Sequence, residues 1–166
     1  MTLTVSKNAI PRLLSAALFL WGGNSCAQPG NFEWPEGKQM AISLTFDDAR
    51  LSQPDKGIPL LDEYDVKATF YVLPGAVEQR LDEWKKAVRN GHEIGNHSVV
   101  HPCSGNFLWS RSYALENYSV PRMKNELVEA NEKLQQMLGI RCETFAYPCG
   151  QTFVGRGKET KSYVPV

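Results

Sequence analysis

The chain has 166 residues, of which 42% are hydrophobic and 22% are charged, an ordinary balance for one globular domain. Lysine and arginine together number 18, as do aspartate and glutamate, so the formal net charge is zero. A neutral chain lacks the excess of basic residues that binds phosphate backbones, and we therefore expect no nucleic-acid partner.

The first 27 residues have the pattern of a secretory signal peptide. Basic residues precede an apolar run, residues 13–21, which is too short for an ordinary transmembrane helix. Small residues at 25–27 then offer a cleavage site, so we expect export to the periplasm or the extracellular space and no transmembrane segment. A buried N-terminal helix stays open as an alternative. Lipid attachment at Cys26 ranks second to cleavage, because Gly23 stands where a lipobox usually has leucine.

Hydrophobic periodicity in the remaining chain predicts strands and helices in alternation. Residues 28–38 contain proline and glycine and form the expected lead-in to the domain. Strands are predicted over residues 40–46, 67–72, 93–95 and 143–147, and helices over 57–64, 76–90 and 119–138. Residues 151–166 show no clear periodicity, and no element is predicted there.

The two longer helices have the clearest amphipathic patterns. Gly91 suits the C-cap of the first, whereas Ser119 is the expected N-cap of the second and Gly139 its end. The buried stripe of the first is predicted to be Val77, Leu81, Trp84 and Val88. The inner face of the second is predicted to be Met123, Leu127, Ala130, Leu134 and Met137 or Leu138.

Three chemically distinctive segments follow predicted strands. Strand and helix alternate at least three times, which indicates an α/β fold with a parallel sheet and right-handed crossovers. In such folds, functional sites form beyond the carboxyl ends of the strands. The segments Asp47-Asp48, His97–His101 and Pro148-Cys149 all come at such ends. We therefore expect them to meet at one edge of the sheet.

His97 and His101 are four residues apart, and a turn of helical pitch would place both imidazoles on one face. Pro102 prevents a helix from running on. Neutral imidazole is a common ligand for zinc, and the best candidate for a third ligand is the carboxylate pair Asp47-Asp48. A histidine pair alone is more often an ordinary surface turn, so this interpretation depends on the carboxylates.

Three segments resemble the motifs of the polysaccharide deacetylases, the NodB-homology family or carbohydrate esterase family 4. Thr45-Phe46-Asp47-Asp48-Ala49 is similar to their first motif, and His97-Ser98-Val99-Val100-His101-Pro102 to their second. Phe145-Ala146-Tyr147-Pro148-Cys149-Gly150 is similar to the third. The resemblance implies a distorted (β/α) barrel with fewer units than the TIM type. We expect residues 39–166 to supply the N-terminal portion of that barrel, in a domain that is C-terminally incomplete.

The resemblance also implies a role for each site residue. It assigns Asp48, His97 and His101 to a divalent metal, with zinc the first choice and cobalt, nickel or iron also suited. It makes Asp47 the general base, which removes a proton as water attacks an acetyl carbonyl. The backbone N–H of Cys149 would help to hold the oxyanion. A turn or capping role for one of the two aspartates is the simpler alternative.

The activity implied by the resemblance is metal-dependent removal of N- or O-acetyl groups from a carbohydrate polymer. Two departures from the family bear on it: Ala146 stands where the family often has an arginine that orients the base, and no histidine follows His101 to act as general acid. The alternatives are an impaired fragment that only binds carbohydrate or metal, and an amidohydrolase acting on a small non-sugar amide. The polysaccharide and the oligomeric state are not specified by the sequence.

The other histidine and a group of aromatic residues have less specific interpretations. His92 precedes a short predicted strand, and we expect it to be structural. Phe107, Trp109 and Tyr113 follow the second motif, where they could equally stack on sugar rings or pack beneath a loop.

Export permits disulfides, and Cys103, Cys142 and Cys149 would remain after cleavage. If the second and third motifs meet at one metal site, as the resemblance implies, Cys103 and Cys149 lie close together. Cys142 and Cys149 bracket a predicted strand and would be roughly 20 Å apart, which is too far to bond. We predict a Cys103–Cys149 disulfide. Three free thiols, or thiolates on the metal without a C-x-x-C spacing, remain as alternatives.

Overall fold

The computed structural model of the protein describes residues 34–164. The expected signal peptide, the alternative role of Cys26 and the start of the lead-in lie outside the described residues. The chain divides into two compact units, residues 1–40 and 41–166, and each is described by itself. In the first unit, one short 3₁₀ helix, η1 (Pro35–Gly37), lies within the described part. Over the described range, none of the helices is long and apolar enough to cross a bilayer.

The second unit is built on a parallel sheet with the strand order β1-β2-β3. The strands are β1 (Thr45–Asp47), β2 (Thr69–Val72) and β3 (Glu93–Asn96). Phe46 pairs with Phe70, and Phe70 pairs with Ile94, so the carboxyl ends of the strands lie at one edge. A parallel bridge between Asn96 and Phe145 brings the third motif to the same edge.

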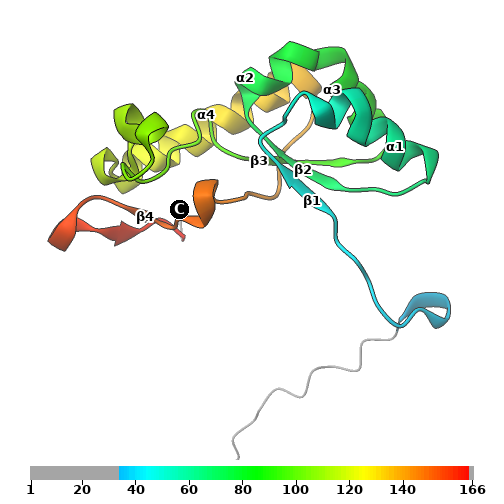
Figure 1. Ribbon diagram of the computed structural model, residues 1–166, viewed down its shortest axis with the longest axis horizontal. Helices are drawn as coiled ribbons and strands as arrows, with labels where there is room; N and C mark the ends of the chain where they lie inside the picture. Colours follow the sequence, from blue (N-terminus) through cyan, green and yellow to red (C-terminus); the bar gives the residue numbers. More distant parts are fainter. Residues whose placement is uncertain (1–33, 165–166) are drawn as a thin grey trace, which may run out of the picture. The chain divides into compact units, whose positions relative to one another are not determined.

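Helices connect the strands, because parallel neighbours need a crossover connection. A π-helix, η2 (Gln53–Gly57), runs into α1 (Ile58–Glu63) between β1 and β2. Between β2 and β3 lie α2 (Pro74–Val77), the 3₁₀ turn η3 (Glu78–Arg80) and α3 (Leu81–Arg89). The long helix α4 (Val120–Leu138) follows β3 and packs against α3 and β3. Figure 1 shows α1 and α3 together on one side of the sheet.

The remaining elements are short. Two 3₁₀ helices, η4 (Leu108–Tyr113) and η5 (Leu115–Asn117), lie between the second motif and α4. The turn η6 (Pro148–Gly150) contains the end of the third motif. An antiparallel pair follows, β4 (Phe153–Val154) with β5 (Lys161–Ser162), and η7 (Gly157–Glu159) lies between them.

The core confirms the predicted faces of the longer helices. Val77 and Trp84 are fully buried, and Leu81 and Val88 pack partly buried against the same cluster. Trp84 meets the ring of Phe70 edge-on at 5.5 Å between centroids, which joins the helical layer to the sheet. The buried residues of α4 are Met123, Ala130, Leu134 and Leu138, while Leu127 and Met137 are partly buried.

The predicted ends of α4 are also confirmed. The Ser119 side chain accepts a hydrogen bond from the backbone N–H of Arg122, as an N-cap should. Gly139 is the C-cap of α4, with a left-handed backbone and φ of 69°. The C-cap of α3 is Asn90, and Gly91 follows it with φ of 87°.

Several predicted boundaries are wrong. The strand predicted over 40–46 begins only at Thr45, which pairs with Thr69 at the start of β2; upstream of it, the Leu44 carbonyl accepts from the Thr69 N–H. The predicted helix over 57–64 starts earlier, as the π-helix from Gln53. The predicted helix over 76–90 begins at Pro74 and is interrupted at Arg80, whose φ of −144° and ψ of 48° are not helical.

Two further predictions differ in the last quarter of the chain. Residues 143–147 form one bridge through Phe145 rather than a strand, because β3 ends at Asn96 and leaves little backbone to pair with. The pair β4–β5 was not predicted, since strands of two residues are too short to produce a periodic pattern. Val154 and Tyr163 of this region are nonetheless buried.

Gly95 is the residue of β3 that tolerates a side chain least. A Cβ atom there would lie 2.5 Å from Cδ1 of Tyr71 and 2.8 Å from Oγ1 of Thr144. We expect Gly95→Ala to lower the free energy of unfolding by about 1–3 kcal/mol, because the tyrosine must move. Gly75→Ala is the matched control, since nothing lies within 4 Å of that position and alanine favours a helix. Equal urea midpoints for the two variants would contradict this account.

Candidate metal centre

The aspartate pair lies where β1 ends and the chain turns sharply. Asp48 and Ala49 both have positive φ, 77° and 52°, which is uncommon for residues other than glycine. Asp47 is exposed, whereas Asp48 is partly buried. Successive residues of a strand point to opposite sides, and the turn at Asp48 directs its carboxylate toward the histidines of the second motif. Strained backbone of this kind is common at functional sites.

The two histidines lie in a tight turn that begins where β3 ends. The Ser98 N–H donates to Oδ1 of Asn96 at 2.6 Å, and the His101 N–H donates to the Ser98 hydroxyl at 3.0 Å. Ser98 and His101 have φ of 69° and 55°. The imidazole rings meet edge-on, with centroids 4.7 Å apart and an angle of 69° between their planes. The spacing of four residues therefore acts through a hydrogen-bonded turn rather than through a helix.

Asp48, His97 and His101 come together as predicted. Oδ1 of Asp48 lies 3.5 Å from Nε2 of His97 and 3.4 Å from Nε2 of His101. The three candidate ligand atoms all lie within 4.8 Å of one another. Zinc ligands at about 2.0–2.2 Å around a tetrahedral centre are separated by about 3.3–3.6 Å. The spacing and chemistry of this donor set therefore fit a divalent metal with a vacant fourth position.

Hydrogen bonding and burial prepare both imidazoles to bind a cation. Nδ1 of His97 lies 2.9 Å from the carbonyl of Ala146, and because a carbonyl only accepts, Nδ1 carries the hydrogen. The lone pair of Nε2 is then directed toward Asp48. Burial lowers the pKa of His101, helped by nearby His97 and opposed by Asp48, so its ring is neutral at neutral pH.

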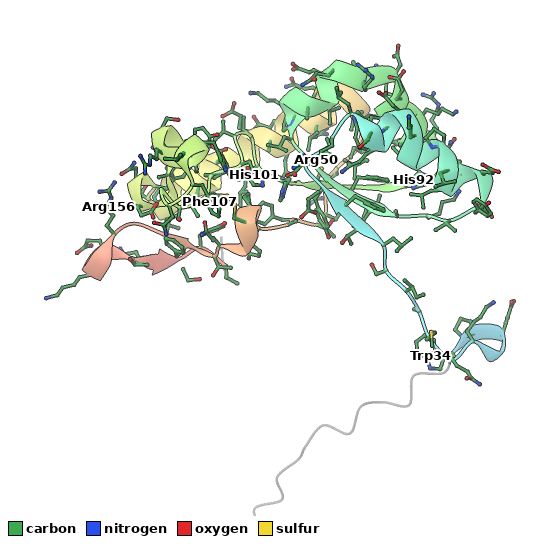
Figure 2. All side chains as sticks on the ribbon, in the orientation of Figure 1. Trp34, Arg50, His92, His101, Phe107 and Arg156 are labelled. Carbon is green, nitrogen blue, oxygen red and sulfur yellow. A yellow bond between two sulfur atoms is a disulfide. The ribbon has the colours of Figure 1, made fainter. Side chains whose placement is uncertain are left out.

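Arg50 holds the carboxylate of Asp48 from the opposite side. Its Nη2 and Nε donate to Oδ2 of Asp48 at 3.2 and 3.3 Å, which leaves Oδ1 facing the histidines. Arg50 and His101 lie near each other in Figure 2. The arginine is exposed, so the contact orients the ligand more than it stabilises the fold. Sequence reasoning missed Arg50, although its place two residues after Asp48 in a turn was a usable signal.

Helix α4 supports the histidine turn from behind. Oε1 of Glu126 accepts hydrogen bonds from the N–H groups of Val99 and Val100, at 3.1 and 2.8 Å. Nδ2 of Asn96 donates to Oδ1 of Asn131 at 2.8 Å and to the carbonyl of Leu127 at 2.9 Å. Sequence reasoning missed these contacts too, because no local pattern relates them to the second motif.

The predicted disulfide between Cys103 and Cys149 is confirmed. Cys142 is free and buried, and burial raises the pKa of its thiol to about 11. The alternatives of three free thiols and of thiolates on the metal are therefore wrong for this structure. His101, Cys103 and Cys149 do form a second group of donor atoms within 4.8 Å, but its sulfur atoms are bonded to each other.

His92 is structural, as predicted, and lies at the opposite end of the sheet (Figure 2). Its Nδ1 accepts a hydrogen bond from the N–H of Ala68 at 3.2 Å, so Nε2 carries the hydrogen and donates to Asp62 at 3.1 Å. Burial opposes ionisation of Asp62, yet hydrogen bonds from Asn90 and His92 hold the pKa of its carboxyl below the ordinary value. This group joins α1 to the end of α3.

Phe107 and Trp109 lie on the surface beside the histidine turn, whereas Tyr113 is partly buried and packs against the core cluster that contains Leu115. The Trp109 ring lies 5.7 Å from that of His101, and the Phe107 ring is stacked on Trp109 at 5.5 Å. Trp109 is 51% exposed and Phe107 is 42% exposed, so neither is packed beneath a loop. They form an apolar surface next to the donor set.

Comparisons with known proteins agree with these motifs. The polysaccharide deacetylase family profile matches residues 35–162, and the chain belongs to that family. It is 40% identical over 120 residues to the peptidoglycan-N-acetylglucosamine deacetylase PgdA of Listeria monocytogenes, covering 71% of this chain and 23% of that protein.

Two solved structures are also similar. The deacetylase PplD of Streptococcus pyogenes, in complex with acetate, aligns with a TM-score of 0.57 and 26% identity, covering 69% of this chain and 49% of that chain. BA3943, a CE4 family pseudoenzyme from Bacillus anthracis, aligns with a TM-score of 0.54 and 26% identity, covering 72% of this chain and 38% of that chain. The expected α/β fold of a partial deacetylase domain is thus confirmed. The chain spans about a quarter of PgdA and at most about half of these structures.

The support from α4 can be tested through zinc affinity. Glu126→Ala removes the carboxylate that holds Val99 and Val100, so the turn becomes less ordered and we expect zinc to bind about tenfold more weakly. Glu129→Ala is the matched control, because Glu129 lies on the same helix and pairs with Lys133 instead. Competition with a chelating dye measures both affinities. If the two variants bind zinc equally well, Glu126 has no such role.

Proposed function

We propose that this chain is the metal-binding part of an exported deacetylase that removes N- or O-acetyl groups from a carbohydrate polymer. The observation that carries the proposal is the Asp48–His97–His101 set, whose ligand atoms lie within 4.8 Å of one another in a polysaccharide deacetylase fold. Zinc is the first choice of metal, with cobalt, nickel or iron also suited to two imidazoles and a carboxylate. The name of the Listeria relative supports peptidoglycan as the polymer.

The residues around this set have complementary roles in acetyl hydrolysis. A divalent metal held by Asp48, His97 and His101 would supply Lewis acidity for the acetyl carbonyl and lower the pKa of water. Asp47 accepts the proton of the attacking water. Nε2 of Gln53 donates a hydrogen bond to the backbone carbonyl of Asp47 at 2.6 Å, which fixes the end of β1. The Cys149 backbone N–H donates to the oxyanion that develops on the acetyl oxygen. Ala146 contributes its carbonyl to His97 but no side chain to orient Asp47.

The exposed aromatic surface supports a polymer as the substrate. Trp109 and Phe107 stack on each other beside His101 and remain open to solvent. Exposed apolar surface next to a polar site is typical of ligand recognition. A sugar ring has an apolar face that suits an aromatic surface of this kind, whereas a small acetylated metabolite would not extend to it.

A second candidate function is binding of carbohydrate or metal without turnover. Two observations favour it: one similar structure is a CE4 family pseudoenzyme, and Ala146 replaces the base-orienting arginine that the family often has. Acetate release separates the two functions. A zinc-loaded chain that binds acetylated oligomers of glucosamine but releases no acetate would have the second function.

The ligand assignment predicts zinc stoichiometry. Asp48→Ala, His97→Ala and His101→Ala each remove one of three ligands, so we expect each variant to lose stoichiometric zinc after dialysis. Asp65→Ala is the control, since this carboxylate is exposed and pairs only with Lys67 at 3.0 Å. Elemental analysis gives the zinc content per chain. Stoichiometric zinc in all three variants would exclude this site.

The assignment of Asp47 as general base predicts that its substitution lowers turnover without removing zinc. Asp47→Asn should keep zinc, because Asp48 and the histidines remain, and should reduce acetate release by about 10²-fold or more. Asp82→Asn, a change on the exposed side of α3, serves as the control. Acetate is measured enzymatically with acetylated glucosamine oligomers as substrate. Full turnover by Asp47→Asn would remove the base role while leaving the metal set intact.

A further inference from the structure

We propose that the Cys103–Cys149 disulfide positions His101 for metal binding, so that the metal affinity of the centre depends on the redox state of this bond. The proposal rests on the proposed function, because it takes Asp48, His97 and His101 as the ligands. It starts from one contact: Sγ of Cys103 lies 3.5 Å from Nδ1 of His101, on the side of the ring opposite Asp48.

This contact favours the tautomer that can bind a metal through Nε2. A disulfide sulfur has no hydrogen and can only accept, so this contact is a hydrogen bond only in the tautomer whose Nδ1 carries the ring hydrogen. Nε2 then has a free lone pair, and it is Nε2 that faces Asp48 at 3.4 Å. In metal sites, the ring nitrogen that does not bind the metal commonly donates a hydrogen bond that orients the histidine. His97 has the same tautomer, set by the carbonyl of Ala146.

A reduced Cys103 would weaken this selection. A thiol can donate as well as accept, so S–H can point at Nδ1 and favour the tautomer with hydrogen on Nε2. That tautomer cannot bind a metal through Nε2. The oxidised bond therefore favours the binding-competent imidazole, whereas two thiols allow both forms.

The disulfide also fixes where the sulfur lies. Cys103 is fully buried, its N–H donates to the Ser110 hydroxyl at 2.9 Å, and its carbonyl accepts from Ser110 and from the Leu115 N–H. Cys149 lies in the turn η6, with φ of 55°. One covalent bond thus joins the residue beside a metal ligand to the residue whose N–H we assign to the oxyanion.

Cys149 is the accessible half of the bond, because it is exposed whereas Cys103 is buried. One thiolate of a small dithiol attacks Sγ of Cys149, the S–S bond breaks, and Sγ of Cys103 leaves and takes up a proton. The second thiol of the reductant then displaces Cys149 and closes a cyclic disulfide. In total, the protein disulfide gains two electrons and two protons, and the dithiol loses them.

The first experiment compares zinc affinities in a Cys142→Ala background, which removes the one free cysteine of the described residues. Cys103→Ala/Cys149→Ala removes both the acceptor and the cross-link, and we expect zinc to bind 10–100-fold more weakly. The background variant alone is the control and should bind as the wild-type chain does. Affinities are measured by chelator competition on folded protein, so that a loss of stability alone does not change the result.

A spectroscopic measurement separates positioning from a merely structural role. The ¹⁵N shifts of the imidazole nitrogens report the tautomer of His101 directly in the metal-free protein. We expect hydrogen on Nδ1 in the oxidised chain and a shift toward hydrogen on Nε2 after reduction. His92, whose tautomer is set by Ala68 and Asp62, should not change and is the internal control. An unchanged His101 tautomer would overturn the proposal.

The wild-type chain provides a test that needs no variant. Since binding and redox are linked reciprocally, a 10–100-fold preference of zinc for the oxidised form makes the midpoint potential about 30–60 mV more negative at saturating zinc. Thiol alkylation in dithiol redox buffers measures this, with free zinc held constant by a chelator. An unchanged potential, or a more positive one caused by thiolates binding zinc, overturns the proposal. Failure of the oxidised chain to bind stoichiometric zinc would overturn the metal assignment as well.

Discussion

The buried side chain of Asn96 is the interaction on which the candidate centre depends. Asn96 is only 3% exposed, and its amide joins the Ser98 N–H to Asn131 and the Leu127 carbonyl of α4. Its backbone bridges to Phe145 and so brings the third motif beside the second. Buried polar groups are costly unless they are satisfied, and a fully satisfied one specifies a single arrangement. One residue therefore orders the end of β3, the histidine turn, α4 and the third motif.

Backbone strain is concentrated in the same place. Seven of the described non-glycine residues have positive φ, and five of them, Asp48, Ala49, Ser98, His101 and Cys149, belong to the three motifs. Each such residue costs about 1–3 kcal/mol and persists only where its surroundings hold it. Here the surroundings include the hydrogen bonds of Ser98, the disulfide and the ion pair of Arg50 with Asp48. Protein contacts alone thus hold the candidate centre in place, and preorganisation of this kind reduces the entropy lost when a ligand binds.

Membership of the polysaccharide deacetylase family indicates the fold and the class of reaction, whereas the geometry of the candidate centre bears on metal binding. The family gives the fold and the class of reaction, and its similar structures include both a deacetylase with acetate and a pseudoenzyme. Whether a metal can bind depends on the candidate donor set, whose three ligand atoms lie within 4.8 Å of one another. Turnover depends further on Asp47 and on how it is oriented, for which Ala146 offers no side chain. Metal binding and catalysis are therefore separate questions for this chain.

The sequence alone determined the alternation of strands and helices, the faces and caps of α4, and the three motif segments, because these follow from local periodicity and from residue types at short spacing. The histidine pair and a neighbouring carboxylate followed from residue types, whereas the choice of Asp48 as the ligand and the Cys103–Cys149 pairing came through the resemblance to a family. The tertiary structure alone decided that residues 143–147 form a single bridge and that a π-helix precedes α1. It also decided that Arg50, Glu126 and Asn96 contact the candidate ligands or the turn that carries them. Asn96 and Asn131 are 35 positions apart, and no local pattern records which distant polar groups meet once the chain has folded.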